Sequence, residues 1–174
     1  MGVFSLGVCA EQLPPQIHKI VPLLKGLGTD PILIAAVKKQ NTNKVSIDDI
    51  KKLDIRWRAT PGISSEMKAM MNNKSALRLS EFEQTRSYFF ELFLMDNQGA
   101  NVAMTNKTSD YWQGDEAKWK ESFNSGKGAV HIGDIEFDES AQDYLVQVSV
   151  PVMDGNKAIG AITIGINLDE LEAQ

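Results

Sequence analysis

Aromatic and hydrogen-bonding side chains gather in one stretch of the chain, TNKTSDYWQGDEAKW, which runs from residue 105 to residue 119. Tyr111, Trp112 and Trp119 are half of all tyrosines and tryptophans in the protein, and Asp110 and Asp115 lie among them. An indole beside a carboxylate can clamp an amine or an amino acid, through cation–π contact and a charge-assisted hydrogen bond. Buried cores, by contrast, are built mainly from aliphatic side chains. The stretch therefore predicts a surface that contacts an amphipathic partner: the rest of the protein, a small ligand or another macromolecule.

The same stretch also has a purely structural interpretation. The sequence DEAKWKESF after Gly114 predicts a short helix, on which Asp115, Trp119 and Phe123 are four residues apart and share one face. A helix that crosses a sheet needs large apolar anchors, so both rings fit a core as well as a pocket. Asp115 likewise fits a helix cap as well as a ligand contact. The sequence leaves both interpretations open.

A second group of chemically capable side chains lies in GDIEFDES, which holds Asp134, Glu136, Asp138 and Glu139. Paired carboxylates can perform acid–base catalysis, so an enzyme that uses Asp134 with Asp138, or Asp110 with Asp115, is one alternative. A solvated loop between strands explains the acids more simply. The chain contains no Gly-x-Ser-x-Gly elbow and no phosphate-binding glycine loop. We therefore expect no enzymatic activity and no catalytic residues.

Overall composition narrows the partners and cofactors. The 174 residues, 43% of them hydrophobic, suffice for one substantial core, so we expect a single domain. The net charge of −5 and the lack of a lysine or arginine cluster argue against nucleic acid as a partner. Cys9 is the only cysteine, and with His18 and His131 it cannot form a Cys/His metal site. The sequence thus predicts neither a metal nor another cofactor.

The first residues, MGVFSLGVCAEQLPP, are similar to the end of an export signal. Val8-Cys9-Ala10 fits the small-residue pattern that precedes a signal-peptidase cut. Residues 1–10 are therefore predicted to be a signal-peptide remnant, with a frayed terminus as the alternative, and residues 11–174 a single periplasmic domain. No later apolar run approaches the ~20 residues that span a bilayer, so we expect no transmembrane span in this chain.

The elements that would position these residues begin with a helical part, residues 14–87. Asp30 and Pro31 precede an apolar set at helical spacing, in the order expected for an N-cap and a first helical residue. Ser46 and Asp49 have the spacing of a capping box. These signals predict several helices in the first half of the chain.

The sheet part, residues 88–168, follows. Runs of β-branched and aromatic residues alternate with turn signals at Asn97-Gln98-Gly99 and Asp154-Gly155-Asn156, which predicts about five antiparallel strands. The predicted fold class is therefore α+β, with helices laid on an antiparallel sheet. Residues 107–127 form a long connection between the second and third strands, and connections of this length are commonly functional.

The predicted strands leave one sheet face partly polar. Alternation in YLVQVSVPV places Gln147 and Ser149 on one side, and alternation in AIGAITIGIN places Thr163 on the side of the small residues. If the 107–127 connection arches over this face, these residues become the floor of a cavity and the three aromatic residues its walls. The alternatives are a solvated face or a closely packed helix. Glu91 adds a carboxylate in the first strand, on a face that the sequence does not fix.

With these elements, the chain resembles the extracytoplasmic Cache sensor domains, also called PDC sensors, of bacterial receptors and stand-alone periplasmic proteins. The likeness runs from Thr29 to Leu171. Its most specific pieces are the Asp96-Asn97-x-Gly99 turn, the segment TSDYWQGDE, and Pro-Val-x-Asp-Gly followed by Ile-Gly-Ala. The resemblance implies a PAS-like five-stranded antiparallel sheet behind a long N-terminal helix. It also implies a ligand held between the sheet and the segment that crosses it.

Family members bind small metabolites such as amino acids, amines or carboxylates and pass a conformational change to a kinase, chemoreceptor or cyclase. Since this sequence ends soon after its last strand, we expect a periplasmic sensor that reports to a separate membrane-bound signalling protein. The alternatives are a fragment of a membrane receptor and a protein-interaction module without a ligand. A homodimer through the N-terminal helix is expected by analogy only. Carried over by position, the implied ligand pocket comprises Asp110, Tyr111, Trp112, Asp115, Trp119, Gln147 and Ser149.

Overall fold

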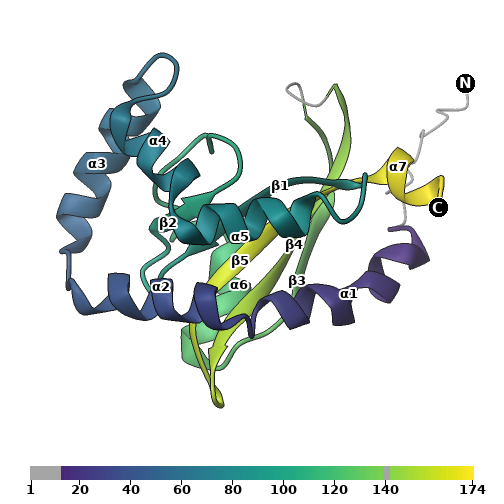
Figure 1. Ribbon diagram of the computed structural model, residues 1–174, viewed down its shortest axis with the longest axis horizontal. Helices are drawn as coiled ribbons and strands as arrows, with labels where there is room; N and C mark the ends of the chain where they lie inside the picture. Colours follow the sequence, from purple (N-terminus) through teal and green to yellow (C-terminus); the bar gives the residue numbers. More distant parts are fainter. Residues whose placement is uncertain (1–12, 139–141) are drawn as a thin grey trace, which may run out of the picture.

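The computed structural model describes residues 13–138 and 142–174 (Figure 1). Cys9 and the predicted signal remnant at residues 1–10 lie outside these described residues, as does Glu139. Within them, helices occupy the first half of the chain and strands most of the second half.

One five-stranded sheet forms the centre of the fold, and all neighbouring strands in it are antiparallel. The strand order is β2-β1-β5-β4-β3. The predicted α+β class with a five-stranded antiparallel sheet is therefore confirmed. The strands are β1 (Phe89–Met95), β2 (Asn101–Met104), β3 (His131–Asp138), β4 (Asp143–Asp154) and β5 (Lys157–Asn167).

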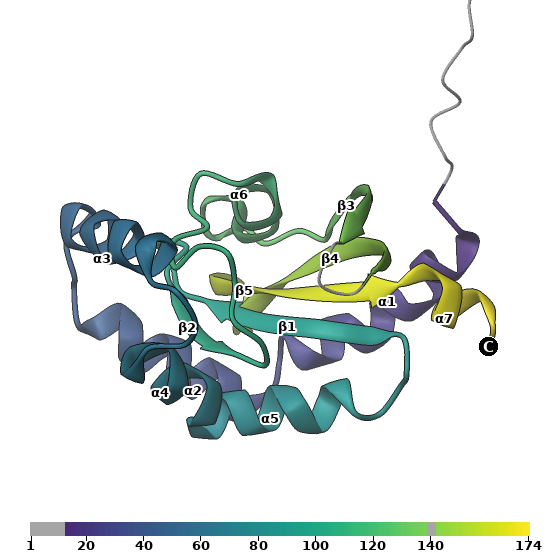
Figure 2. The same ribbon diagram turned by 90° about the horizontal axis from the view of Figure 1, so that it is seen from above.

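Helices cover both faces of the sheet (Figure 2). α1, α2 and α5 lie on one face, and α6 lies on the other. α3 and α4 lie at the β2 end of the sheet, and α7 follows β5. The helices are α1 (Pro15–Leu27), α2 (Pro31–Thr42), α3 (Ile47–Ala59), α4 (Ser65–Asn72), α5 (Lys74–Glu83), α6 (Ala117–Phe123), the short 3-10 helix η1 (Asn124–Gly126) and α7 (Leu168–Glu172).

Two apolar clusters hold these layers together. The first fills the space between the sheet and α1, α2 and α5. The second lies on the other face and extends to α3 and α4, through Trp57, Met67, Phe93 and Tyr111. Alternation along each strand separates the two clusters, because successive side chains point to opposite faces of a sheet. The strand residues of the first cluster include Leu92, Leu94, Val146, Val148, Ile162 and Ile164.

The chain bends sharply between α1 and α2. The Asp30 carboxylate caps α2 by accepting the backbone N–H of Ile32 at 2.9 Å, and Pro31 is the first helical residue. The two helices meet at an angle of 64°. The described chain therefore has two shorter helices where the family resemblance implied one long N-terminal helix.

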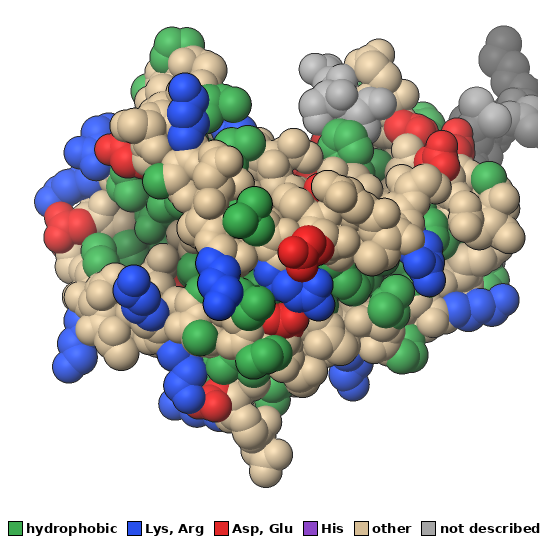
Figure 3. Space-filling model, in the orientation of Figure 1, with side chains coloured by type: hydrophobic (Ala, Val, Ile, Leu, Met, Phe, Trp, Pro, Cys, Tyr) green, Lys and Arg blue, Asp and Glu red, His purple; other side chains and the backbone are tan. Residues whose placement is uncertain are grey.

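No single helix in the described ranges is long and apolar enough to cross a membrane. α1 and α2 reach that length and apolar content only when they are taken together across their bend. Their residues Ile17, Leu24, Leu33 and Val37 are fully buried in the first cluster. On the outer side of this helical layer, basic and acidic side chains are scattered between hydrophobic ones (Figure 3).

α6 is shorter than the helix that the sequence predicted. Glu116 is its N-cap residue, and the helix ends at Phe123, where Asn124 follows with a left-handed backbone (φ 46°). Asp115 precedes the helix, so the prediction that it shares a helical face with Trp119 is wrong. Trp119 and Phe123 do share a face, and their ring centroids stack 5.0 Å apart.

Candidate functional site

The connection between β2 and β3, called here the crossing segment (residues 105–130), passes over the sheet face opposite α1, α2 and α5 (Figure 2). Its first part is tied to the β1–β2 turn and to β2. The backbone N–H of Asn101 donates to the Tyr111 carbonyl at 3.0 Å, and the backbone N–H of Gln113 donates to the Gly99 carbonyl at 2.8 Å. This part of the crossing segment is therefore fixed to β2 and to the β1–β2 turn before the chain crosses the sheet.

α3 clamps the same part of the crossing segment. The Asp54 carboxylate, only 6% exposed, accepts the backbone N–H groups of Tyr111 at 2.9 Å and Trp112 at 3.1 Å. The buried Trp57 indole donates to the Thr108 carbonyl at 2.9 Å. It also packs on the Tyr111 ring, with centroids 5.6 Å apart. A carboxylate and an indole of α3 thus position the backbone on either side of residue 110.

Two of the aromatic residues predicted to form pocket walls direct their polar atoms to the β1–β2 turn. Trp112 Nε1 donates to the Gln98 carbonyl at 2.7 Å, and Trp119 Nε1 donates to the Asp96 carbonyl at 2.9 Å. A buried indole N–H needs such a partner. Both indoles therefore anchor the crossing segment to the turn beneath it.

The floor under the crossing segment is polar, as the strand alternation predicted. Ser149 and Thr163 are fully buried on this face, and their hydroxyl oxygens lie 2.8 Å apart in one hydrogen bond. Gln147 Nε2 donates to Glu91 Oε1 at 3.0 Å. This contact puts Glu91 on the same face as Gln147, which the sequence had left open.

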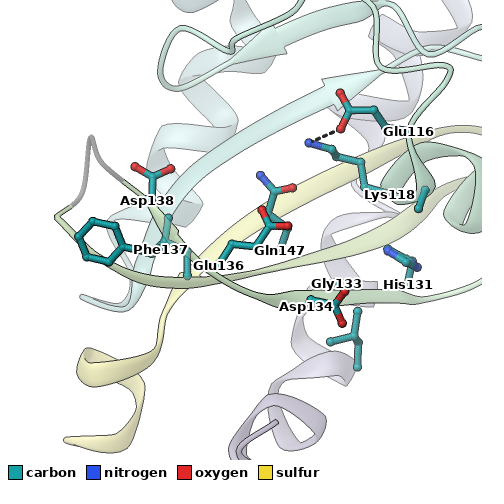
Figure 4. Close-up of a pocket in the computed structure, with 12 residues that line it drawn as sticks. Glu116, Lys118, His131, Gly133, Asp134, Glu136, Phe137, Asp138 and Gln147 are labelled. Carbon is teal, nitrogen blue, oxygen red and sulfur yellow. Dashed lines mark ion pairs between the residues drawn. The ribbon is translucent and has the colours of Figure 1, made fainter. Parts of the chain in front are cut away.

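Two adjoining hollows lie between this floor and the crossing segment, with volumes of about 310 and 320 Å³. Both are lined by Lys118, Asp138 and Gln147, so we treat them as one sheet-face cleft. Figure 4 shows Glu136 and Gln147 on the sheet, with Lys118 and Glu116 reaching in from the crossing segment. Other residues that line the cleft include Glu91, Phe93, Lys107, Gln113, His131 and Asp134.

Acidic groups dominate the charge of the cleft. Burial raises the pKa of Glu91 above its ordinary value, and the Asp138 charge adds to the rise. The hydrogen bond from Gln147 and the charge of Lys118 act in the opposite direction. Lys118 Nζ itself pairs with Glu116 Oε2 at 2.8 Å. The cleft therefore presents a ligand with carboxylate oxygens more than with free cationic groups.

A third hollow, of about 270 Å³, lies between α3 and the crossing segment; we call it the outer hollow. Arg58 Nε lies 3.6 Å from Asp110 Oδ1 there. The hollow is lined by Lys51, Asp54, Ile55, Arg58, Asp110, Trp112, Asp115 and Glu116.

The structure distributes the seven predicted site residues over three environments. Gln147 lines the sheet-face cleft. Asp110, Trp112 and Asp115 line the outer hollow. The other three line neither and are held within the fold: Tyr111, Trp119 and Ser149.

Among the charged residues that line the sheet-face cleft, the sequence indicated only Asp134 and Asp138, as an alternative catalytic pair, and it indicated none of them as a ligand contact. Glu91 had a usable signal, since it is the single acid in an otherwise apolar strand. Lys118 and Gln113 lie in the stretch that was singled out. Whether they face the sheet depends on the residue at which α6 begins and on the backbone contacts of the turn, which no local pattern specifies.

The fold and the site can be compared with known proteins. The family described as methyl-accepting chemotaxis protein-like, first PDC sensor domain, matches residues 64–173. No curated protein matches the chain. Among solved structures, the sensor domain of the V. cholerae histidine kinase DctB is 12% identical, over 90% of this chain and 51% of that one, with a TM-score of 0.50.

Two chemoreceptor domains are less similar in structure. The ligand-binding domain of Campylobacter jejuni Tlp3, solved with 4-methylisoleucine, is 13% identical over 92% of this chain and 63% of that one, with a TM-score of 0.42. The ligand-binding domain of the Pseudomonas aeruginosa amino acid chemoreceptor PctC, solved with GABA, is 12% identical over 90% of this chain and 64% of that one, with a TM-score of 0.41.

The chain spans about half the length of the DctB domain and less than two thirds of either chemoreceptor domain. At these identities the likeness shows the fold alone. The family match is of a different kind, because it covers more than half of the chain and includes the sheet and the crossing segment. The chain therefore belongs to the PDC sensor domains of the methyl-accepting chemotaxis protein-like family.

Proposed function

We propose that this sensor domain binds a small-molecule ligand in the sheet-face cleft and reports its presence to a separate membrane-bound signalling protein. One observation carries the proposal: the cleft lies between a polar sheet floor and a crossing segment that supplies part of its lining. A ligand in this position contacts two elements that are far apart in sequence. Its binding energy therefore depends on how the crossing segment sits on the sheet.

The residues divide into those that contact the ligand and those that position the crossing segment. Gln147 and Glu91 contact it from the floor, and Lys118 lines the cleft on the side of α6. Asp54 and Trp119 fix the backbone around the cleft through the hydrogen bonds described above. The predicted site residues that line no hollow belong to this second group, as positioning residues.

The outer hollow is the competing location for a ligand. It contains Asp110, Trp112 and Asp115, the residues to which the family resemblance pointed. We favour the sheet-face cleft because the Trp112 indole N–H is already bonded to a backbone carbonyl. Asp54, which also lines the outer hollow, likewise already accepts hydrogen bonds from two backbone N–H groups.

A thermal-shift screen of the chain against amino acids, amines and short carboxylates tests the proposal. A ligand at 100 times its dissociation constant adds about 2.7 kcal/mol, which raises the melting temperature of a domain of this size by several degrees. We expect a hit whose shift is lost in Gln147→Ala and retained in Asp115→Ala, with both variants folded. Loss in Asp115→Ala alone would move the site to the outer hollow. No hit in any class would favour a protein-interaction module.

The domain works in the periplasm under this proposal, in keeping with the export-like pattern of residues 1–10. Alkaline phosphatase fused after residue 174 provides the test, because the enzyme becomes active only after export. We expect alkaline phosphatase activity when the fusion keeps residues 1–10 together with the sequence that surrounds them in the natural protein. An inactive but abundant fusion would contradict this location without affecting the ligand site.

A further inference from the structure

The charged side chains that line the sheet-face cleft are mostly acidic. Its two lysines are both engaged: Lys107 Nζ donates to the carbonyls of Thr60 at 3.0 Å and Gly62 at 2.8 Å, and Lys118 pairs with Glu116. The acids outnumber them. Figure 4 shows several of these carboxylates around the same hollow. The acidic residues that line the cleft are Glu91, Glu116, Asp134, Glu136 and Asp138.

Gln113 supplies an independent observation. Gln113 is among the residues that line the cleft and is almost fully buried, with 1% of the residue exposed. Gln113 Nε2 donates to the Asp110 carbonyl at 2.9 Å, which fixes the orientation of the amide. Its Oε1 has no hydrogen-bond partner in the part of the chain that the structure describes. Buried acceptors in native proteins are paired as a rule, so this atom calls for a donor that a ligand would provide.

Glu91 offers a second acceptor in the same hollow. Gln147 bonds one of its oxygens, Oε1. Burial is the main reason why the pKa of Glu91 is raised, and the Asp138 charge adds a smaller contribution in the same direction. A cation with N–H donors beside the Glu91 carboxyl group favours its ionised form, because it pairs with the charge and donates a hydrogen bond to it.

The chemistry fits an organic cation better than a metal ion. Among the described residues, no three His, Cys, Asp or Glu side chains converge closely enough to hold a metal. The cleft also has an aromatic wall, Phe93, and the Lys118 ammonium already lies 5.5 Å from the centroid of its ring. An aromatic face next to carboxylates suits an ammonium or guanidinium group with an apolar stem.

We propose that the sheet-face cleft selects an organic cation with N–H donors and no carboxylate: a primary amine or a guanidine. The inference rests on the proposed function, since it names the ligand class of the same cleft. The cationic group donates to Glu91 and to Gln113 Oε1, and its stem lies against Phe93. Glu136, which is exposed at the same hollow, accepts a second positive charge when the ligand has one.

Isothermal titration calorimetry on the full chain tests this assignment with five probes: 1-aminobutane, 1,4-diaminobutane, agmatine, succinate and leucine. We expect the amines or agmatine to bind, and neither succinate nor leucine to bind. Glu91→Gln should weaken binding of every cation at least tenfold. Glu136→Gln should weaken 1,4-diaminobutane and leave 1-aminobutane unchanged. The matched control is Glu121→Gln, which makes the same change at an exposed position of α6 outside the cleft and should alter nothing.

The outcomes separate this inference from the proposed function. If succinate or a zwitterionic amino acid such as leucine binds instead, and Gln147→Ala abolishes that binding, the cationic class is overturned while the sheet-face cleft stands. Cation binding that survives Glu91→Gln in a folded protein would overturn the assignment of cations to this cleft. If no cation, carboxylate or amino acid binds, both proposals are overturned.

Discussion

Glu91 and Gln147 lie on strands that are not neighbours, yet their side chains meet at 3.0 Å across the strand between them. Both pair in register with Gly165 of β5. A Cβ atom at residue 165 would lie 2.8 Å from Glu91 Cγ, closer than such atoms approach. Glycine at this position therefore allows the two side chains to meet.

Gly165→Ala should displace Glu91 and break its hydrogen bond with Gln147. Extra volume in a packed site costs about 1–3 kcal/mol, so we expect a loss of stability near the lower end, because the Glu91 side chain can move. Any cation that binds the cleft should bind more weakly. Urea unfolding and calorimetry measure the two effects.

Gly26→Ala is the control for that substitution. Gly26 lies near the end of α1, and no atom lies within 4 Å of an added Cβ. The helical preference for alanine over glycine, about 0.5–1 kcal/mol, should make this variant equal to or more stable than the wild type. If Gly165→Ala behaved like Gly26→Ala, the steric role of Gly165 would be refuted.

Asp54→Ala should be among the most damaging polar substitutions in the chain. It leaves the backbone N–H groups of Tyr111 and Trp112 without their acceptor, and each unsatisfied buried group costs about 1–3 kcal/mol. We expect a loss of about 3 kcal/mol, which lowers the melting temperature by about 6–12 °C. Differential scanning calorimetry provides the measurement.

Asp115→Ala supplies the comparison, because Asp115 is an exposed aspartate of the same crossing segment. A surface substitution of this kind changes stability by no more than about 0.5 kcal/mol. Equal losses in the two variants would mean that Asp54 does not clamp the crossing segment.

Ser149 and Thr163 should behave as a coupled pair. Each hydroxyl is fully buried and has the other as its partner. Thr163→Val or Ser149→Ala alone leaves one buried hydroxyl without its partner and should lower the free energy of unfolding by about 1–3 kcal/mol. Removing both hydroxyls should cost less than the two single changes added together. A double-mutant cycle measured by urea unfolding tests this. Simple additivity would show that the hydrogen bond contributes nothing to stability.

Glu91 should make stability depend on pH. Its pKa is raised in the folded protein, so the folded state keeps the proton over a pH range in which the unfolded state has lost it. Its contribution is complete below the ordinary glutamate pKa and is lost as pH rises through the raised pKa. Glu91→Gln imitates the protonated form and retains an acceptor for Gln147.

The free energy of unfolding of Glu91→Gln should therefore exceed that of the wild type at neutral pH, and the difference should shrink as the solution becomes acidic. Urea unfolding across a series of buffers measures this difference, with Glu121→Gln as the variant that changes charge at an exposed position. A difference that grew on acidification would reverse the sign and contradict the shift assigned to Glu91.

Local patterns predicted much of the fold. Asp30 with Pro31 marked the start of α2, and Ser46 marked the start of α3, because a cap is a contact between residues two or three apart. Turn residues at 97–99 and 154–156 placed two hairpins. Alternation put Gln147, Ser149 and Thr163 on the polar face before any strand register was known.

The sequence by itself thus determined the α+β class, about five antiparallel strands and the polar sheet face, since each depends on neighbours along the chain. Whether residues 107–127 cover that face was left open by the sequence and was decided by the tertiary structure. Tertiary structure alone decided what the polar and aromatic side chains do. The Trp112 and Trp119 indoles donate to carbonyls of the β1–β2 turn, and the Asp54 carboxylate accepts from backbone N–H groups 57 and 58 residues away. Glu91 reached Gln147 only because the strand order brought Gly165 between them. Contacts of this kind depend on register and packing between elements, which no local spacing encodes.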